Sequence, residues 1–132
     1  MKEIIEFFKQ FPCLVGCRIR EDFLTPEDGS IAIAHDGGEQ TLKVYTSGDM
    51  LGQICFKLLY RGIFTGEAGK IFDEISCKIA ESKVELPVLS GGRTVQYSEI
   101  TEGPALIKTE VGAGVYEMKF RLVYYRKGER NE

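Results

Sequence analysis

The sequence predicts an α+β fold in which an antiparallel β-sheet meander packs against one long amphipathic helix, with a short helix at the N-terminus. Two patterns carry this prediction. Residues 115–125 alternate between apolar and polar side chains, which is typical of a half-buried strand, and residues 67–83 place apolar side chains three and four positions apart, which is typical of a helix. No linker divides the 132 residues, so we expect a single domain, 1–132.

The first eleven residues are expected to form the short N-terminal helix. Their apolar side chains gather on one side of a helix, opposite the charged ones, and these are Ile4, Ile5, Phe7, Phe8 and Phe11. Pro12 stops the helix because it disfavours helical angles at the residue before it. We expect the helix to dock through its phenylalanines.

Three or four strands follow in the prediction. Residues 13–19 are read as a short strand and residues 21–30 as a loop, because the loop contains Thr25-Pro26 and Asp28-Gly29. Residues 31–34 and 41–45 flank Asp36-Gly37-Gly38 and are predicted to form a hairpin. Residues 52–60 are apolar on both faces, which predicts a central strand.

The long helix is predicted over residues 67–83. Its apolar side is formed by Ala68, Ile71, Phe72, Ile75 and Ile79. At ~1.5 Å per residue it would be about 25 Å long. Thr65 or Gly66 would cap its start, and Glu67 would lie near the positive end of the helix dipole.

Three more strands are predicted at 93–100, 105–111 and 115–125, separated by turns at Glu102-Gly103-Pro104 and 112–114. In the last strand one face is apolar and is expected to form the floor of the core under the helix around Phe72. The opposite face carries Glu117, Lys119 and Arg121, which we expect to be free for solvent or for a neighbouring subunit. Residues 126–132 lack apolar anchors and are expected to fray.

Composition excludes several classes of function. A net charge of −3 and a pI of about 5.3 argue against tight binding of nucleic acid, although DNA could pass a mildly acidic wall without sticking. No apolar run is long enough to cross a membrane, and no secretion signal is recognisable. The four cysteines, at 13, 17, 55 and 77, are read as small buried apolar residues of a reducing cytosol rather than as a zinc site.

No motif predicts a catalytic, cofactor-binding or metal-binding residue. His35 beside Asp36 could orient a general base, but it has no nucleophile nearby and is read as a turn residue. Glycine-rich stretches at 48–52 and 90–93 lack the spacing of a nucleotide-binding loop. The acidic residues of the 21–28 loop do not follow the ligand order of a calcium-binding loop.

Apolar residues in two loops are the candidate interface. Phe23 and Leu24 lie in the first long loop, and Leu86, Val88 and Leu89 follow the long helix. Large apolar residues in connecting segments either fold back as lids on the core or meet a partner, and both alternatives stay open. Together with Glu117, Lys119 and Arg121 they are the residues predicted to contact a subunit or partner.

The order of these elements resembles that of phage tail-terminator and minor tail or minor capsid proteins, which join head and tail. The similarity rests on four features: the chain length, the helix at 2–11, the 31–60 meander with Tyr60-Arg61-Gly62 leading into the helix, and the ending from Gly114 to Arg126. It covers most of the chain and concerns the order of the elements rather than particular residues.

The resemblance implies a non-enzymatic virion protein without a cofactor. Such proteins commonly form a hexameric ring that caps the tail tube, contacts tail-tube and head-connector proteins, and lets DNA pass through. It implies location in the virion, and in the bacterial cytoplasm during assembly. Exposed strand edges and apolar loops are the features that ring formation needs.

Two other readings stay open. A small-molecule binding module would need an apolar pocket between sheet and helix, lined by Phe56, Phe72, Met118 and Phe120, although side chains of this size normally form solid core. A small enzyme would need convergent polar groups in such a pocket, and a buried His35 beside a carboxylate would be its sign.

Overall fold

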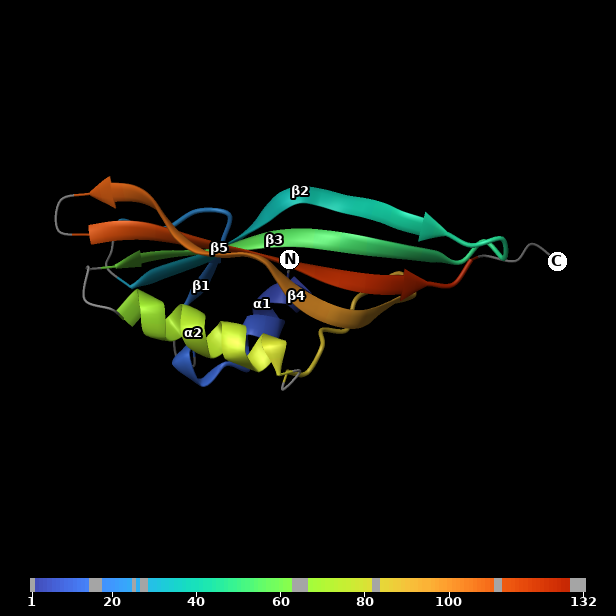
Figure 1. The fold of residues 1–132 in the computed structure, drawn as a ribbon, viewed down its shortest axis with the longest axis horizontal. Coiled ribbons are helices and arrows are strands. Elements are labelled where there is room, and N and C mark those ends of the chain that lie inside the picture. Colours follow the sequence, from blue (N-terminus) through green and yellow to red (C-terminus); the bar gives the residue numbers. More distant parts are fainter. Residues whose placement is uncertain are drawn as a thin grey trace.

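A five-stranded mixed sheet with two short helices on one face forms the protein (Figure 1). The computed structural model describes residues 2–14, 18–24, 26, 29–62, 67–81, 84–110 and 113–128. The strands are β1 (Ile19–Glu21), β2 (Ser30–Val44), β3 (Met50–Gly62), β4 (Arg93–Glu110) and β5 (Ala113–Arg126). The helices are α1 (Lys2–Lys9), the 3₁₀ turn η1 (Pro12–Leu14) and α2 (Glu67–Ala80).

The sheet order is β1-β2-β3-β5-β4, with β3 at the centre. β1 runs parallel to β2 and pairs with it only from Ile31 to Ile33, while the other pairs are antiparallel. β3 pairs with β5 along all of its 13 residues, roughly 43 Å at ~3.3 Å per residue. β4 is therefore one edge of the sheet, and β1 together with the uncovered half of β2 is the other.

The predicted fold class is wrong. The sheet is mixed rather than an antiparallel meander, and α2 has 14 residues instead of the 17 predicted at 67–83, so no long helix spans the sheet. The strands are longer because two predicted turns are irregularities inside single strands. Gly37 and Gly38, both with positive φ, lie in a bulge within β2, and Glu102-Gly103-Pro104 lies among the register shifts of β4.

Of the other predicted elements, two strands are confirmed and one is misplaced. The strand at 115–125 is confirmed as the main part of β5, and the strand at 52–60 as the central strand β3. The predicted strand at 13–19 is wrong in position, since η1 occupies its start and β1 begins only at Ile19. The expected cap at Thr65 or Gly66 lies outside the described residues.

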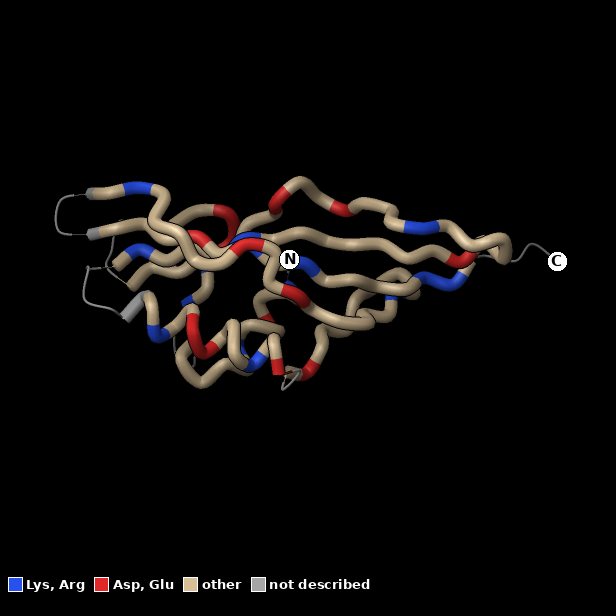
Figure 2. Tube along the Cα trace, viewed as in Figure 1, with Lys and Arg blue, Asp and Glu red and all other residues tan. Residues whose placement is uncertain are grey.

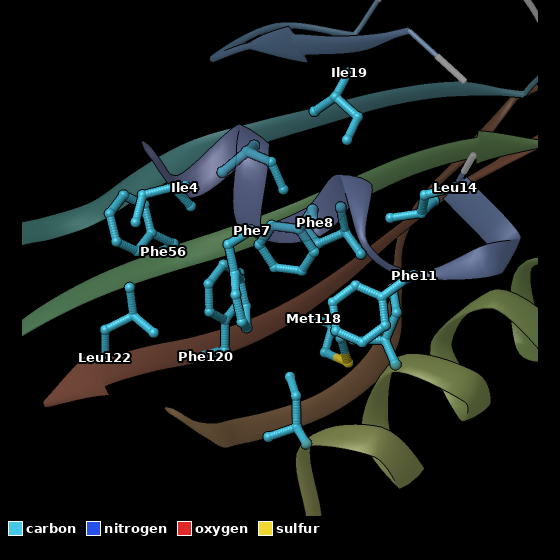
Figure 3. Packing of buried hydrophobic residues seen from close by; sticks show 14 of the residues in the cluster. Ile4, Phe7, Phe8, Phe11, Leu14, Ile19, Phe56, Met118, Phe120 and Leu122 are labelled. Atoms are coloured by element: carbon cyan, nitrogen blue, oxygen red, sulfur yellow. The ribbon is translucent and has the colours of Figure 1, made fainter. Parts of the chain in front are cut away.

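The centre of the core is covered by α1 rather than by the helix around Phe72. Phe8 of α1 meets Phe120 of β5 edge to face, with ring centres 4.8 Å apart, and Phe120 stacks on Phe56 of β3 at 5.7 Å. Figure 3 shows Ile4, Phe7 and Phe8 directed at these rings. α2 packs Phe72 against Tyr60 and Tyr116 nearer one end of the sheet.

A short turn joins α1 to the rest of the core. After the helix the amide of Phe11 donates to the carbonyl of Phe8 at 3.2 Å, and the amide of Leu14 to that of Phe11 at 2.9 Å. Because Pro12 stops the helix and the chain tightens there, Phe11 and Leu14 are both buried, with 0% and 1% of their surface exposed.

Replacing Phe8 by alanine should lower the free energy of unfolding by about 3–5 kcal/mol, because a fully buried aromatic ring leaves a cavity. Urea denaturation of both proteins in the same state of association measures the difference. Phe23→Ala is the matched control. It removes the same side chain from an 80% exposed position and should change the value by less than about 0.5 kcal/mol. Equal losses in the two variants would contradict the central role of α1.

Candidate functional site

The five predicted loop residues divide between surface and core. Phe23 and Val88 are 80% and 87% exposed, Leu86 is 37% exposed, and Leu24 is partly buried. Leu89 is 8% exposed and belongs to the hydrophobic core. Leu89 therefore acts as a lid, while Phe23, Leu86 and Val88 present apolar surface to solvent.

Phe23 projects from a turn that the backbone holds in place. The amide of Asp22 donates to the carbonyl of Ile33 in β2 at 2.9 Å, and the amide of Phe23 donates to the carbonyl of Glu21 at 2.8 Å. Asp22 has a φ of 66°, a conformation that residues other than glycine adopt at a cost. An exposed aromatic ring on a tied-down turn is a suitable anchor for a contact with another molecule.

The segment before β4 is also fixed. The side-chain amide of Gln10 donates to the carbonyl of Glu85 at 2.9 Å and accepts from the amide of Glu85 at 2.7 Å, and Val88 forms a bridge with Thr94. Between this segment and α1 lies a hollow of about 330 Å³. It is lined by Glu3, Glu6, Phe7, Gln10, Glu85, Leu86, Pro87 and Val88. We call it the α1 groove.

Arg121 is part of a polar row that crosses the four long strands. Its guanidinium donates to Glu99 at 2.8 Å and to Gln53 at 3.0 Å, and Gln53 donates to Gln40 at 2.8 Å. The hydrogen bond to Glu99 raises the pKa of Arg121. The row therefore ties β2, β3, β5 and β4 together on the face opposite the helices.

A second row centres on Lys119. Its ammonium lies 3.6 Å from a carboxylate oxygen of Glu102, 3.8 Å from Glu117 and 4.0 Å from Asp36. Asp36 and then Glu102 raise the pKa of Lys119. The predicted interface residues Glu117, Lys119 and Arg121 are thus engaged with other residues of their own sheet, which leaves fewer charges to offer a partner.

Apolar exposure elsewhere follows the two edges of the sheet. Among the residues that the structure describes, nine large apolar side chains are exposed: Phe23, Leu42, Val44, Tyr45, Leu86, Val88, Tyr97, Leu106 and Ile107. Phe23 follows β1, Leu42 and Val44 lie on the uncovered end of β2, and Tyr45 lies in the β2–β3 turn. The other five lie on β4 or on the segment bridged to it.

Six of these nine were not predicted, although a signal for some of them was present. Leu106 and Ile107 are adjacent, and side chains of adjacent residues point to opposite faces of a strand, so a single covered face cannot bury both. The sequence does not reveal which strands are edges, because that depends on the order in which the strands pair.

The residues considered for chemistry do not assemble into a reactive site. His35 is exposed and lies against the Phe56 ring, with centres 5.1 Å apart. Burial and then Asp36 raise the pKa of the Cys55 thiol, which disfavours the reactive thiolate. Cys17 lies outside the described residues, and within them no group of three or more His, Cys, Asp or Glu could hold a metal ion.

The glycine-rich stretches are connections into strands. Gly48, with a φ of 89°, lies in the turn from β2 to β3, where the amide of Tyr45 donates to the carbonyl of Asp49 at 2.8 Å. Gly91 and Gly92 lead directly into β4 rather than into a helix. Neither therefore resembles a phosphate-binding loop. Of the acidic loop, Glu27 and Asp28 lie outside the described residues.

The four residues of the possible ligand pocket pack as solid core. Phe56, Phe72, Met118 and Phe120 are each at most 1% exposed, and the hydroxyl of Ser76 donates to the sulfur of Met118 at 3.5 Å. Their side chains occupy the space that an apolar ligand would need.

Comparison with known proteins identifies no family, because no protein-family model and no curated protein matches the chain. Among the described residues, no helix is long and apolar enough to cross a membrane. Figure 2 shows acidic and basic residues interspersed along the described parts of the sheet and helices.

The start of the C-terminal tail is anchored, contrary to the expectation that residues 126–132 fray from Arg126. Asp49 in the β2–β3 turn accepts a hydrogen bond from the Tyr125 hydroxyl and another, at 2.7 Å, from the amide of Gly128. The Tyr125 bond and then the Gly128 bond lower the pKa of Asp49. The chain beyond β5 is therefore held at the β2–β3 turn as far as Gly128.

Asp49→Asn should loosen this anchor at neutral pH. A carboxyl whose pKa is lowered by folding stabilises the fold above its unfolded value of about 3.9, and the contribution is lost as the pH falls through the lower folded value. At pH 7 the wild type should therefore have a higher denaturation midpoint than the variant, and its Gly128 amide should be better protected from hydrogen exchange. Both differences between the two proteins should shrink below about pH 4. Asp73→Asn, exposed on α2, is the control and should show no such pH-dependent difference. A constant difference at every pH would contradict the anchor.

Proposed function

We propose that this chain is a non-enzymatic structural subunit that assembles side by side with copies of itself into a closed ring, as phage tail-terminator and head-tail joining proteins do. One observation carries the proposal: eight of the nine exposed large apolar side chains of the described residues lie on the two edge strands or on the segments beside them, and the ninth, Tyr45, lies in the turn that follows β2. Exposed apolar groups gathered at strand edges mark association sites or aggregation sites, and a subunit that is buried in a ring avoids the second outcome.

In the proposed ring the β2 edge of one copy meets the β4 edge of the next, and because these edges differ in sequence the contact is heterologous. A heterologous contact repeated by rotation closes into a ring, whereas contact between identical patches gives a dimer. β2 and β4 run in opposite directions in the sheet. When the β2 edge of one copy faces the β4 edge of the next, the alternation of strand direction continues from copy to copy.

Side chains rather than a continuous backbone ladder make this contact. β4 has register shifts at four places, and Pro104 removes a backbone donor within it. Bulges and proline of this kind keep an edge strand from pairing indiscriminately with other chains. Affinity and specificity then come from the apolar side chains and the charges around them.

The phage setting rests on the sequence resemblance and on this surface. The polar rows on the sheet face opposite the helices give a ring a hydrated face, and a chain of net charge −3 has little tendency to retain DNA that passes through. The ends of the ring would then meet tail-tube and head-connector proteins. Genes for portal, capsid and tail-tube proteins beside this gene would support the setting, and metabolic genes in their place would count against it.

Two complementary variants test the assembly by sedimentation velocity. Val44→Asp damages the β2 edge and Val88→Asp damages the β4 edge, so each variant alone should remain monomeric while the wild type sediments as a ring. A mixture of the two should form a dimer and nothing larger, because the intact β2 edge of the Val88→Asp protein meets the intact β4 edge of the Val44→Asp protein.

Cys77→Asp adds the same charge on the exposed side of α2 and should leave the ring intact. A wild-type protein that stays monomeric at high concentration contradicts the proposal. Failure of the mixed variants to form a dimer contradicts a contact between two different edges.

A further inference from the structure

The exposed apolar residues on each edge form two separate groups. Along the β1 and β2 edge, one group is Phe23 and the other is Leu42, Val44 and Tyr45. Along the β4 edge, one group is Leu106 with Ile107, and the other is Leu86 with Val88 beside the α1 groove. Tyr97 lies between these two. Each edge thus carries an apolar contact point near each end.

The distance between the two groups on each edge can be counted in residues of the central strand β3. The Phe23 turn is bonded to Ile33, which is opposite Leu58, and Val44 is opposite Met50, so eight residues of β3 separate the two groups. On the other edge, pairing through β5 places Leu106 level with Tyr60 and Thr94, the bridge partner of Val88, level with Leu51.

The separation on the β4 edge is therefore nine residues of β3. At ~3.4 Å per residue the two spacings are about 27 Å and 31 Å. The two edges consequently match when a second copy lies beside the first with almost no shift along the strands.

One matched pair is apolar. The α1 groove is lined by Phe7, Leu86 and Val88 together with Glu3, Glu6 and Glu85. The facing end of β2 presents Val44, which is 66% exposed, whereas the neighbouring Lys43 points to the opposite face and lies over the Tyr45 ring, 5.0 Å from its centre. Val44 therefore supplies the apolar surface that faces the groove.

The second matched pair is aromatic and aliphatic. Phe23 stands on its hydrogen-bonded turn, and Leu106 and Ile107 are 46% and 51% exposed on β4. A fixed aromatic ring against branched aliphatic side chains buries a large apolar area with little loss of conformational freedom.

We propose that neighbouring copies in the ring meet in register, with Val44 of one copy at the α1 groove of the next and Phe23 against its Leu106 and Ile107. The occupant of the α1 groove is thus a second copy of this chain. This inference rests on the proposed ring and specifies its contact. The alternative alignment, Val44 against Ile107, requires a shift of about ten residues along the strands and leaves the groove unoccupied.

Disulfide trapping between singly substituted proteins tests the register. Equal amounts of Val44→Cys and Val88→Cys protein are mixed, oxidised mildly and run on a non-reducing gel, and the same is done with Phe23→Cys and Ile107→Cys. Both mixtures should give a cross-linked dimer, because a disulfide needs Cα atoms within about 7 Å. Val44→Cys mixed with Ile107→Cys is the shifted control and should give no more dimer than the wild type with its own four cysteines.

The outcomes distinguish a failure of the in-register contact from a failure of the ring itself. Cross-linking only in the shifted mixture, or in Val44→Cys protein alone, overturns the in-register contact while leaving a ring possible. No cross-link in any mixture, with a wild type that still sediments as a ring, also overturns it. A monomeric wild type overturns the ring itself. The circular dichroism spectrum of each reduced variant must match that of the wild type, which shows that the substitutions leave the fold unchanged.

Discussion

The packing of α1 on the centre of the sheet is the contact on which the rest of the structure depends. Phe8 fills the space over Phe120, and Phe7 and Phe11 lie against Phe8 with ring centres 5.2 Å and 5.8 Å away. This aromatic cluster covers the middle of the sheet with only eight helical residues. A cover that is short leaves the ends and edges of the long strands outside its reach.

The uncovered part of the sheet is stabilised by a smaller set of contacts. Glu39 pairs with Arg93 and accepts a hydrogen bond from the Tyr124 hydroxyl at 2.9 Å, which joins β2, β4 and β5 beyond the helices. The Tyr124 ring lies across β3 at Gly52, where an added Cβ would be 2.5 Å from the hydroxyl oxygen. This end of the sheet can thus stay ordered without a helix over it, and its edges stay open.

The sequence revealed individual elements better than their arrangement. The alternation from Tyr116 to Tyr124 predicts a strand because its period of two has no competing reading. Gly37-Gly38 and Gly103-Pro104 mark either turns or bulges, and local sequence does not distinguish these, because both use residues with unusual backbone freedom. The periodicity of α1 and α2 predicts two helices but does not show which of them covers the centre of the sheet, because that depends on the order in which the strands pair.

Among the exposed apolar residues, too, some could be predicted from the sequence and others could not. Phe23, Leu86 and Val88 stand out in sequence because large apolar residues are unusual in loops, and they are indeed exposed. Val44 and Leu106 do not stand out, because apolar residues in strands are normally buried, and they become exposed only through the order β1-β2-β3-β5-β4. Pairing between distant segments decides which strands are edges, and it is set by the whole core.

In the proposed ring, two unlike edges of one sheet recognise each other. Native mass spectrometry of the unmodified protein at increasing concentration tests this most directly. A single closed oligomer of three or more copies should replace the monomer and should not grow further. A persistent monomer, or a series that ends at the dimer, would contradict it.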